Sequence, residues 1–405
     1  MVAVRAWAGT AGPLAAFRDY RPLQRTTSTF AGTIAHPRTI DGRMSDFAQT
    51  LIRWQRTHGR HDLPWQACRD PYRIWISEIM LQQTQVDTVI PYYRRFLARF
   101  ATIDALAGAK LEEVLALWSG LGYYARARNV HACARILVAE HDGRFPALAE
   151  EIARLPGIGR STAAAIAVFA FGARAAILDG NVKRVLCRHF GITGDPASSR
   201  VLAELWSRAE SLLPAARVDV YVQAQMDLGA TVCLRTRPHC GRCPLHDSCT
   251  ARREGRTAEL PSRRTRPPRP QRHRQMLVLR AADRRVLLEQ RPAAGLWGGM
   301  LVLPDYDGEI DELAGWLAPR YGLRPSAVLA LPPLRHAFTH FTLQISPWLV
   351  DVEETSRRLG ESTARWADAS SLDALPLPAP VRRILEGLAA LNPLPAACAG
   401  AGRSG

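Results

Sequence analysis

The sequence predicts two domains of different class, an all-α domain followed by an α+β domain. Apolar residues recur every three or four positions from Asp46 to about Glu210, whereas short β-type runs dominate after residue 274. The 405 residues suffice for two domains with hydrophobic cores. A formal net charge of +16 favours a polyanionic partner, chiefly nucleic acid, with genome bias toward arginine as the alternative explanation.

Turn signals bound each helical element of the first part. Helical periodicity is clearest in four stretches: Phe47–Trp54, Ile76–Val86, Leu111–Trp118 and Ile152–Leu155. Glycine and proline residues, such as Pro156-Gly157, separate these stretches. The longest apolar run, Ala163–Phe171, is far shorter than the roughly 20 residues that a membrane-spanning helix needs.

The second part combines strands with two helices. Strands are predicted at Met276–Leu279, Arg285–Gln290, Leu301–Leu303 and Phe341–Val350, and helices at Ile310–Tyr321 and Pro380–Leu391. Between the two parts, residues 251–274 carry nine arginines against two acidic residues, and Pro261 and Pro267 break any helix there. We expect an extended basic linker that follows a phosphate backbone. Residues 1–43 are expected to form a disordered extension, with a transit peptide as the alternative.

Four cysteines spaced C-x6-C-x2-C-x5-C are the most specific chemical signal: Cys233, Cys240, Cys243 and Cys249. Four thiolates in one short loop suit a single inorganic centre. A disulfide framework fits poorly, because the other cysteines are scattered singly (Cys68, Cys133, Cys187 and Cys398). Structural zinc sites usually pair two C-x2-4-C knuckles across a longer gap. The compact spacing therefore favours a [4Fe-4S] cluster, with zinc as the rival.

A glycine pair precedes an alanine-rich helix in the stretch Leu155–Thr162. Gly157 and Gly159 free the backbone to turn sharply, and the helix that begins near Arg160 presents unpaired N–H groups. Such a helix end binds anions such as phosphate. An ordinary helix–helix turn is the alternative, but the basic chain and the cysteine loop favour DNA.

With these motifs, the chain resembles adenine DNA glycosylases of the MutY type, which belong to the helix-hairpin-helix superfamily together with endonuclease III. The resemblance spans about residues 46–390, and its most specific motif is Ser77–Val86. It implies an all-α helix-hairpin-helix glycosylase domain at 44–250 with an iron-sulfur loop at 233–249. It also implies the linker 251–274, an α+β Nudix-like domain at 275–390 and a flexible tail at 391–405.

Two carboxylates carry the chemistry that the resemblance implies. Glu78 lies on a largely apolar helix face, where burial would raise its pKa and keep it protonated as a general acid toward adenine N7. Asp179 follows an apolar run, so it either caps the next helix or stabilises the sugar cation that base loss leaves, or does both. The choice between electrostatic and covalent stabilisation stays open. The resemblance gives Asn181 the task of holding this network.

Ser161 separates two classes within the superfamily. Endonuclease III-like enzymes that also cut the strand carry a lysine at this position, because an amine is needed to form a Schiff base. A serine predicts a monofunctional glycosylase, with Ser161 near the sugar or the base.

The remaining site residues are also implied by the resemblance. Residues that fill the stack or contact DNA are Gln83, Tyr123, Thr84 and Leu121, the last two near the base opposite adenine, together with Gly157, Gly159 and Arg160 of the hairpin. Residues of the adenine pocket are Trp65, Leu81 and Gln223. Residues of the loop that reads 8-oxoguanine are Phe338, Thr339 and His340. The Nudix-like domain carries Glu309 and Glu312 but no glutamate cluster for magnesium, so we expect recognition rather than hydrolysis.

The resemblance implies a base-excision-repair glycosylase that acts on double-stranded DNA with adenine opposite 8-oxoguanine or guanine. We expect a monomer in the bacterial cytoplasm, associated with the nucleoid and not with a membrane. Three alternatives stay open. They are a thymine or uracil glycosylase for mismatches, a non-catalytic iron-sulfur DNA-binding protein, and a nucleotide-pool hydrolase.

Overall fold

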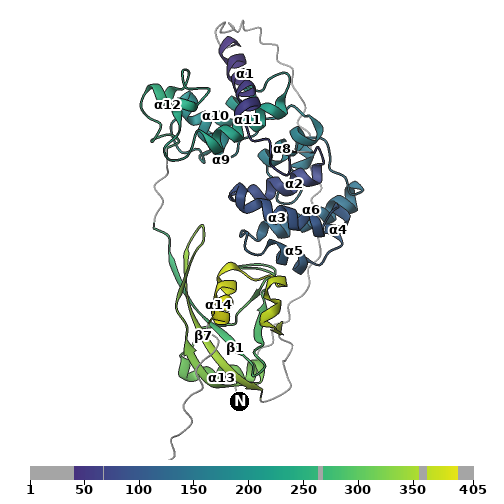
Figure 1. Cartoon of the computed structure of the whole chain (residues 1–405), viewed down its shortest axis with the longest axis vertical. Helices are drawn as coiled ribbons and strands as arrows, with labels where there is room; N and C mark the ends of the chain where they lie inside the picture. Colours follow the sequence, from purple (N-terminus) through teal and green to yellow (C-terminus); the bar gives the residue numbers. More distant parts are fainter. Residues whose placement is uncertain (1–40, 67, 263–267, 355–362, 391–405) are drawn as a thin grey trace, which may run out of the picture. The chain divides into compact units, whose positions relative to one another are not determined.

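The computed structural model describes residues 41–66, 68–262, 268–354 and 363–390 (Figure 1). The predicted tail at 391–405 lies outside the described residues, as does the predicted extension up to residue 40. Residues 41–43, however, belong to the first helix, so helical structure begins slightly earlier than predicted.

The helical part follows the predicted order of elements. Its helices are α1 (Asp41–His58), α2 (Pro71–Leu81), α3 (Val86–Arg99), α4 (Ile103–Ala107), α5 (Leu111–Trp118), α6 (Ala125–His141), α7 (Ala149–Ile152), α8 (Arg160–Phe171), α9 (Gly180–Phe190), α10 (Ser199–Ser211), α11 (Val218–Thr231), the 3₁₀ turn η1 (Cys240–Arg242) and α12 (Thr250–Arg253). Local sequence explains their limits. Asp70 caps α2 by accepting from the Tyr72 N–H, Pro71 occupies its first turn, and α9 ends at Gly191 with a φ of 68°.

Two hydrophobic cores organise these helices, and α8 contributes to both. The first core, built largely by α2, α3, α5 and α6, includes the fully buried side chains Trp75, Phe96, Leu115 and Trp118. The second core, built by α1 and α9–α11, includes Leu51, Val182, Leu186 and Tyr221. In α8, Ala163 and Ala167 belong to the first core, and Ala164 and Ala165 to the second. Small side chains on both sides of α8 let the two cores approach closely.

The C-terminal part is a mixed sheet with a helix on each face. Its described elements are β1 (Gln271–Arg280), β2 (Val286–Gln290), β3 (Leu301–Val302), β4 (Asp305–Tyr306), η2 (Ile310–Glu312), α13 (Leu313–Tyr321), β5 (Leu323–Ala330), β6 (Leu334–Ala337), β7 (Thr342–Glu354), β8 (Ala364–Ala367), η3 (Ala369–Ala374) and α14 (Ala379–Ala390). The central path runs β3-β2-β1-β7-β5, and β4, β6 and β8 pair with β1, β7 and β2. Strands β1 and β7 are parallel, and the other pairs are antiparallel.

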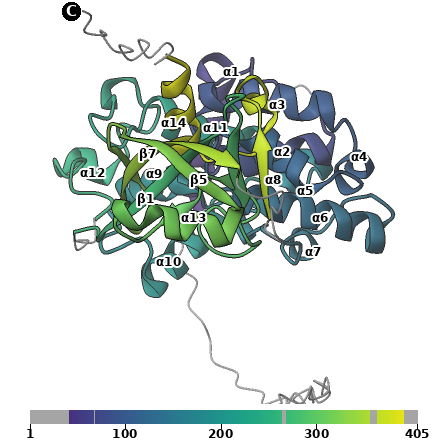
Figure 2. The ribbon, with the colours of Figure 1, turned by 90° about the horizontal axis from the view of Figure 1, so that it is seen from below.

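Alternating side chains of β1 explain why this sheet is covered on both faces. Leu277 and Leu279 pack into the cluster that contains residues of α13, whereas Met276 and Val278 belong to the cluster that contains residues of α14. Figure 2 shows α13 and α14 on opposite sides of β1 and β7. The period of two is that of a strand buried on both faces.

Comparison with the expectations confirms the fold class, with one correction. The four predicted strands and both predicted helices of the second part are present. The extended-linker interpretation of residues 251–274 is wrong at both ends, because α12 includes Ala251 and β1 begins at Gln271. The interior is also anchored, since Leu260 is buried and its carbonyl accepts from Arg188 Nε at 2.8 Å. Within the described ranges, no helix is long and apolar enough to cross a membrane.

Candidate active site and metal centre

A pocket of about 530 Å³ is lined by residues from both cores of the helical part. Glu78 and Leu81 reach it from α2, Gln223 from α11, and Trp65 from the loop before α2. The three residues predicted for an adenine pocket and the predicted acid are thus brought together. A volume of this size is typical of small-ligand sites and holds a purine base.

Glu78 is set up to keep a proton near neutral pH. Burial, and to a smaller extent the neighbouring Asp179 carboxylate, raises its pKa to about 7. Its helix, capped at Asp70 and packed through Trp75 and Ile79, holds the carboxyl at the pocket wall. A carboxylic acid with such a pKa is matched to proton donation at physiological pH.

Asp179 caps α9, as one of the two sequence interpretations predicts. Its side chain accepts from the Val182 N–H at 2.7 Å. Burial raises the pKa of Asp179, and hydrogen bonds from the backbone N–H groups of Val182 and Asn181 oppose that rise. The carboxylate therefore lies at the positive end of a helix, close enough to Glu78 to influence its pKa.

Asn181 connects this corner to the cysteine loop. Its Oδ1 accepts from Arg184 at 2.7 Å, and Arg184 also donates to the carbonyls of Gly229 (2.8 Å) and Cys233 (2.7 Å). A Cβ on Gly229 would lie 2.5 Å from the Asn181 Cβ, so only glycine lets α11 approach α9 this closely.

Ser161 supports the segment that leads into Asp179. Its Oγ accepts from the Leu178 N–H at 3.0 Å, one residue before Asp179. A protonated lysine in its place has no lone pair and cannot accept this bond. The hydroxyl thus has a structural task at the hairpin, in addition to the position near sugar or base that the sequence suggests.

Gln83 and Tyr123, the two predicted wedges, share an uncommon backbone conformation. Both have positive φ (60° and 52°) although neither is glycine, and both side chains are exposed. Gln83 lies in the turn after α2, and Tyr123 follows Gly122 in the turn before α6. Residues held in the left-handed region store strain and concentrate at functional sites.

A buried arginine joins these two turns. Arg126 is 9% exposed, and its guanidinium donates to three carbonyls at the end of α2, those of Ile79, Met80 and Gln82 (2.8, 2.8 and 2.6 Å). It also donates to the Gly122 carbonyl at 3.2 Å. Burial lowers its pKa to about 10. The negative end of the α2 dipole, in place of a carboxylate, stabilises this charge.

Two other residues predicted to lie near the base opposite adenine, Leu121 and Thr84, are enclosed by the helical part. Leu121 is buried in the first core (6% exposed). Thr84 is half-buried, and its Oγ1 accepts from Arg126 at 3.3 Å.

The hairpin between α7 and α8 has the predicted turn. Gly157 has a φ of 76°, and a Cβ there would lie 2.6 Å from the Asn129 Cβ. Gly159 caps α8 with open space around its Cα. Arg160, predicted to contact DNA, is exposed and lies over the Trp206 ring of α10 (3.8 Å), in an ion pair with Glu210.

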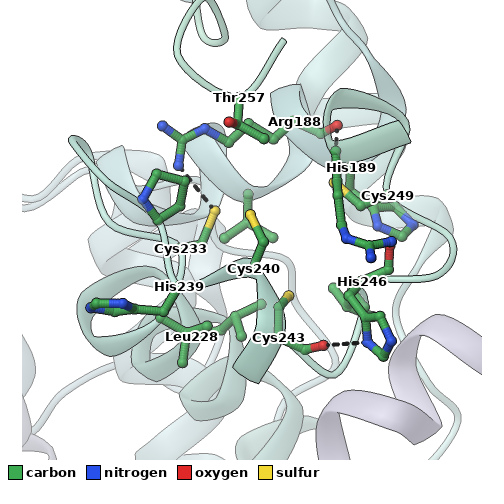
Figure 3. A pocket seen from close by; sticks show the side chains of 15 residues that line it. Arg188, His189, Leu228, Cys233, His239, Cys240, Cys243, His246, Cys249 and Thr257 are labelled. Atoms are coloured by element: carbon green, nitrogen blue, oxygen red, sulfur yellow. Dashed lines mark hydrogen bonds between the residues drawn. The ribbon is translucent and has the colours of Figure 1, made fainter. Parts of the chain in front are cut away.

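The four predicted metal ligands line one small pocket (Figure 3). Cys233, Cys240, Cys243 and Cys249 face it together with apolar side chains such as Leu228 and Leu245. Arg188 donates to Cys233 Sγ at 3.3 Å. Burial raises the pKa of Cys243 to about 12, and the neighbouring sulfur atoms add to this rise.

This donor set fits an iron-sulfur cluster. Four sulfur ligands from one loop, an apolar lining and an N–H donor to one sulfur are the features by which proteins hold and tune such clusters. Across the part of the chain that the structure describes, no three His, Cys, Asp or Glu side chains are arranged to hold a single metal ion.

The predicted 8-oxoguanine loop lies between β6 and β7. The Phe338 N–H donates to the Phe341 carbonyl at 2.9 Å, and the two rings stack with centroids 4.6 Å apart. Thr339 and His340 are exposed at the tip of this turn. The stacked Phe338 and Phe341 rings fix the conformation of the turn, so the polar side chains at its tip face solvent from a rigid loop.

Sequence reasoning missed several residues of the site. Arg126 was not among the predicted site residues, although it anchors the turns that carry Gln83 and Tyr123. Gln66 lines the pocket, and Asp227, fully buried, holds Arg60 and Gln223 at its wall. The one usable signal was Asp227 itself, an acidic residue within the otherwise apolar stretch Met226–Gly229.

Known proteins match the chain over both parts. The model of the HhH-GPD superfamily of base excision DNA repair proteins matches residues 76–211, and that of the NUDIX domain matches residues 275–387. The chain is 36% identical over 346 residues to adenine DNA glycosylase of Buchnera aphidicola subsp. Baizongia pistaciae, which covers 85% of this chain and 97% of the relative.

More distant matches include a mammalian protein and a solved structure. Adenine DNA glycosylase of Homo sapiens is 34% identical over 384 residues, covering 79% of this chain and 70% of the relative. A solved thermostable thymine-DNA glycosylase is 30% identical, covers 53% of this chain and 98% of its own, and has a TM-score of 0.49. The resemblance seen in the motifs is confirmed by the Buchnera relative. Because that relative is matched over nearly its whole length, this chain belongs to the adenine DNA glycosylase family, DNA N-glycosylases of the HhH-GPD superfamily.

Proposed function

We propose that this chain removes adenine paired with 8-oxoguanine or guanine in double-stranded DNA by hydrolysing the N-glycosidic bond. The observation that carries the proposal is Glu78 at the pocket wall, with its pKa raised to about 7 chiefly by burial and with the Asp179 carboxylate close enough to contribute to that rise. Adenine is a poor leaving group until a ring nitrogen gains a proton, and this pair supplies both an acid and a carboxylate for the sugar.

The proposed reaction balances with groups on this chain and one water. Glu78 gives its proton to adenine N7, and the bond between N9 and the sugar C1′ breaks with its electrons going to the base. Asp179 stabilises the cation left on the sugar. Water adds its hydroxyl to C1′ and its proton restores the acid, so the products are free adenine and an abasic site.

The enzyme is proposed to stop at the abasic site. Cutting the strand requires an amine that forms a Schiff base, and the hairpin position holds Ser161, whose hydroxyl accepts from the Leu178 N–H. The chain has only two lysines, Lys110 and Lys183, and neither lines the pocket.

We further propose that Cys233, Cys240, Cys243 and Cys249 hold a [4Fe-4S] cluster, because four sulfur ligands of one loop line one pocket beside Arg188. A bound cluster would be ligated by the four thiolates and would fix the fold of the loop that carries them. Arg184 donates to the carbonyl of Cys233 and to Asn181, so the loop's order supports the corner that holds Asp179.

The C-terminal part is proposed to recognise 8-oxoguanine opposite the target adenine. Thr339 and His340 offer polar groups at an exposed tip held by the stacked Phe338 and Phe341 rings. Exposed Gln83 and Tyr123 are proposed to fill the stack after adenine leaves it, on DNA of the nucleoid. The proposed domains run from α1 to α12 and from β1 to α14.

Single-turnover release assays on three duplexes test this function. They carry adenine opposite 8-oxoguanine, adenine opposite guanine, or thymine opposite guanine, and alkali converts abasic sites to strand breaks. We expect adenine release from the first two, breaks only after alkali, and no release from a Glu78→Gln control. Thymine release at a comparable rate would favour a mismatch thymine glycosylase, and a borohydride-trapped adduct would contradict the monofunctional assignment.

A further inference from the structure

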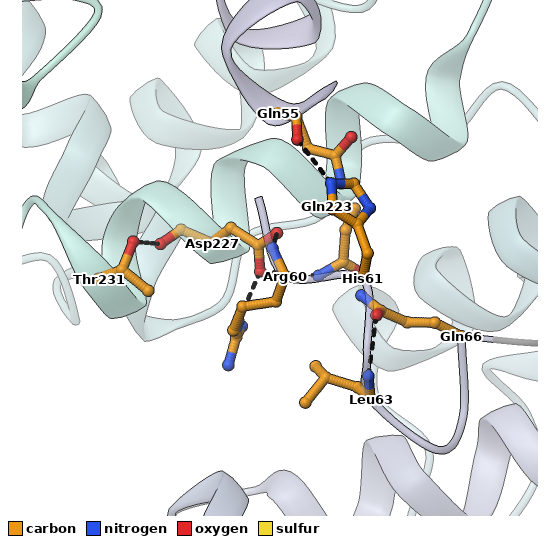
Figure 4. Close-up of polar contacts among 8 residues, drawn as sticks. All are labelled: Gln55, Arg60, His61, Leu63, Gln66, Gln223, Asp227 and Thr231. Atoms are coloured by element: carbon orange, nitrogen blue, oxygen red, sulfur yellow. Dashed lines mark hydrogen bonds and ion pairs between the residues drawn. The ribbon is translucent and has the colours of Figure 1, made fainter. Parts of the chain in front are cut away.

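A second buried carboxylate lies directly behind the proposed adenine pocket. Asp227 of α11 is fully buried and does not line the pocket itself. Its two oxygens accept three hydrogen bonds (Figure 4): Arg60 N–H to Oδ2 at 3.0 Å, Arg60 Nε to Oδ1 at 2.8 Å, and Gln223 Nε2 to Oδ1 at 2.9 Å. In all three contacts the carboxylate oxygen is the acceptor, and Arg60 also forms an ion pair with it.

This contact fixes which end of the Gln223 amide faces the pocket. A glutamine amide has a donor and an acceptor end of nearly equal shape, so an unconstrained one presents either. Because Asp227 can only accept, the Gln223 NH₂ must turn to it, and Oε1 is left for the pocket. Gln223 lines that pocket together with Glu78.

The other glutamine at the pocket is fixed in the opposite sense. Gln66 Oε1 accepts from the Leu63 N–H at 3.3 Å, so its NH₂ group is left as a donor. The pocket thus holds one oriented acceptor and one oriented donor. Adenine carries the matching pair on adjacent atoms, an amine that donates (N6) and a nitrogen that accepts (N1), whereas hypoxanthine carries the reverse at both.

We propose that Asp227 is a positioning residue that sets base specificity by holding the Gln223 carbonyl toward the exocyclic amine of adenine. The inference rests on the proposed function and deepens it. It differs from a purely structural role for the Asp227–Arg60 pair, which would affect every base equally.

Asp227→Ala tests this inference through the ratio of two rates. The alanine removes the oxygen that accepts from both Arg60 Nε and Gln223 Nε2, so Arg60 is left to donate to the Gln223 carbonyl, and the amide reverses and presents a donor to the pocket. We expect the single-turnover rate on adenine to fall about tenfold, which corresponds to about 1.4 kcal/mol, with no matching fall on hypoxanthine in the same duplex. Damage to folding would lower both rates together.

A compensating change provides the rescue. In Asp227→Ala with Gln223→Glu, both carboxylate oxygens of the glutamate accept, so one accepts from Arg60 and the other faces the pocket, and the wild-type ratio of adenine to hypoxanthine should return. Gln225→Leu is the matched control: Gln225 is buried on the same helix, donates to the Tyr221 hydroxyl at 3.1 Å and does not line the pocket. Its ratio should equal that of the wild type.

The possible outcomes distinguish a failure of the positioning role of Asp227 from a failure of the proposed adenine glycosylase function. Equal loss on both bases in Asp227→Ala would overturn the positioning role alone. A wild-type chain that releases no adenine would overturn the proposed function and this inference with it. If Asp227→Ala does not fold, Gln223→Met, which keeps the Asp227–Arg60 pair, must show the same selective loss on adenine, and an unchanged ratio there would refute the idea.

Discussion

Replacing Glu78 by glutamine is expected to stabilise the folded protein while it abolishes base release. Glutamine has nearly the shape of the protonated acid but cannot ionise. In the wild type, burial raises the pKa of Glu78 from 4.5 to about 7, so folding disfavours the charged form. The stability of the wild type relative to the glutamine variant is therefore greatest below pH 4.5, falls as pH rises toward 7, and levels off above that.

The size of the effect follows from the shift. A displacement from 4.5 to about 7 corresponds to about 3 kcal/mol, of which about 2.5 kcal/mol develops between pH 5 and pH 8. Urea unfolding of both proteins at pH 5, 6, 7 and 8 measures it. The free energy of unfolding of Glu78→Gln should increase relative to that of the wild type as the pH rises from 5 to 8.

Activity should follow the opposite course. Only the protonated acid donates, so single-turnover adenine release by the wild type should decline as pH rises above about 7. Glu78→Gln should be slower by at least about 100-fold at every pH. A stability difference that does not change with pH, or a wild-type rate that rises between pH 7 and pH 9, would refute the assignment of Glu78 as a buried, protonated acid.

Cys240→Ser should lower the iron and sulfide content of the purified protein and weaken duplex binding by at least about tenfold, with a much smaller effect on the single-turnover rate of the bound enzyme. A collapsed rate with intact binding would contradict this. Tyr123→Gly relieves a left-handed backbone conformation but adds freedom to the unfolded chain, so the free energy of unfolding should change by less than about 1 kcal/mol while adenine release slows. Equal release by this variant would remove Tyr123 from the proposed wedge. Gly229→Ala places a methyl group 2.5 Å from the Asn181 Cβ and should cost about 1 to 3 kcal/mol in urea unfolding, together with a slower rate; an unchanged midpoint would show that α9 and α11 adapt freely.

The fold was predictable from the sequence where the pattern is local. Period-3.6 and period-2 runs predicted the helices of the first part and four strands of the second, because burial of one face imposes that spacing. The four cysteines were equally readable, since their spacing brings them into one loop. The strands β4, β5, β6 and β8 were not: β4, β6 and β8 have only two to four residues, and β5 is largely exposed after Leu323, so its residues do not alternate between apolar and polar.

Residues of the site that depend on distant partners could not be predicted. Asp227 is 167 positions from Arg60, and the sense of the Gln223 amide depends on that contact. The linker error has the same cause: Leu260 is one apolar residue among prolines and arginines, and its anchor, Arg188, lies 72 positions away. The spacing of apolar residues predicts which face of an element is buried. It does not predict which residue, distant in the sequence, packs against that face.

The anchoring of Arg126 has a genetic consequence. Its acceptors at the end of α2 are main-chain oxygens, which every residue type carries, so no side-chain change on that helix can weaken them or compensate for their loss. A salt bridge can be broken from either partner and repaired from the other, but this attachment can be lost only at the arginine. Suppressor screens that start from an Arg126 change should therefore return revertants at codon 126 and none among the α2 acceptors.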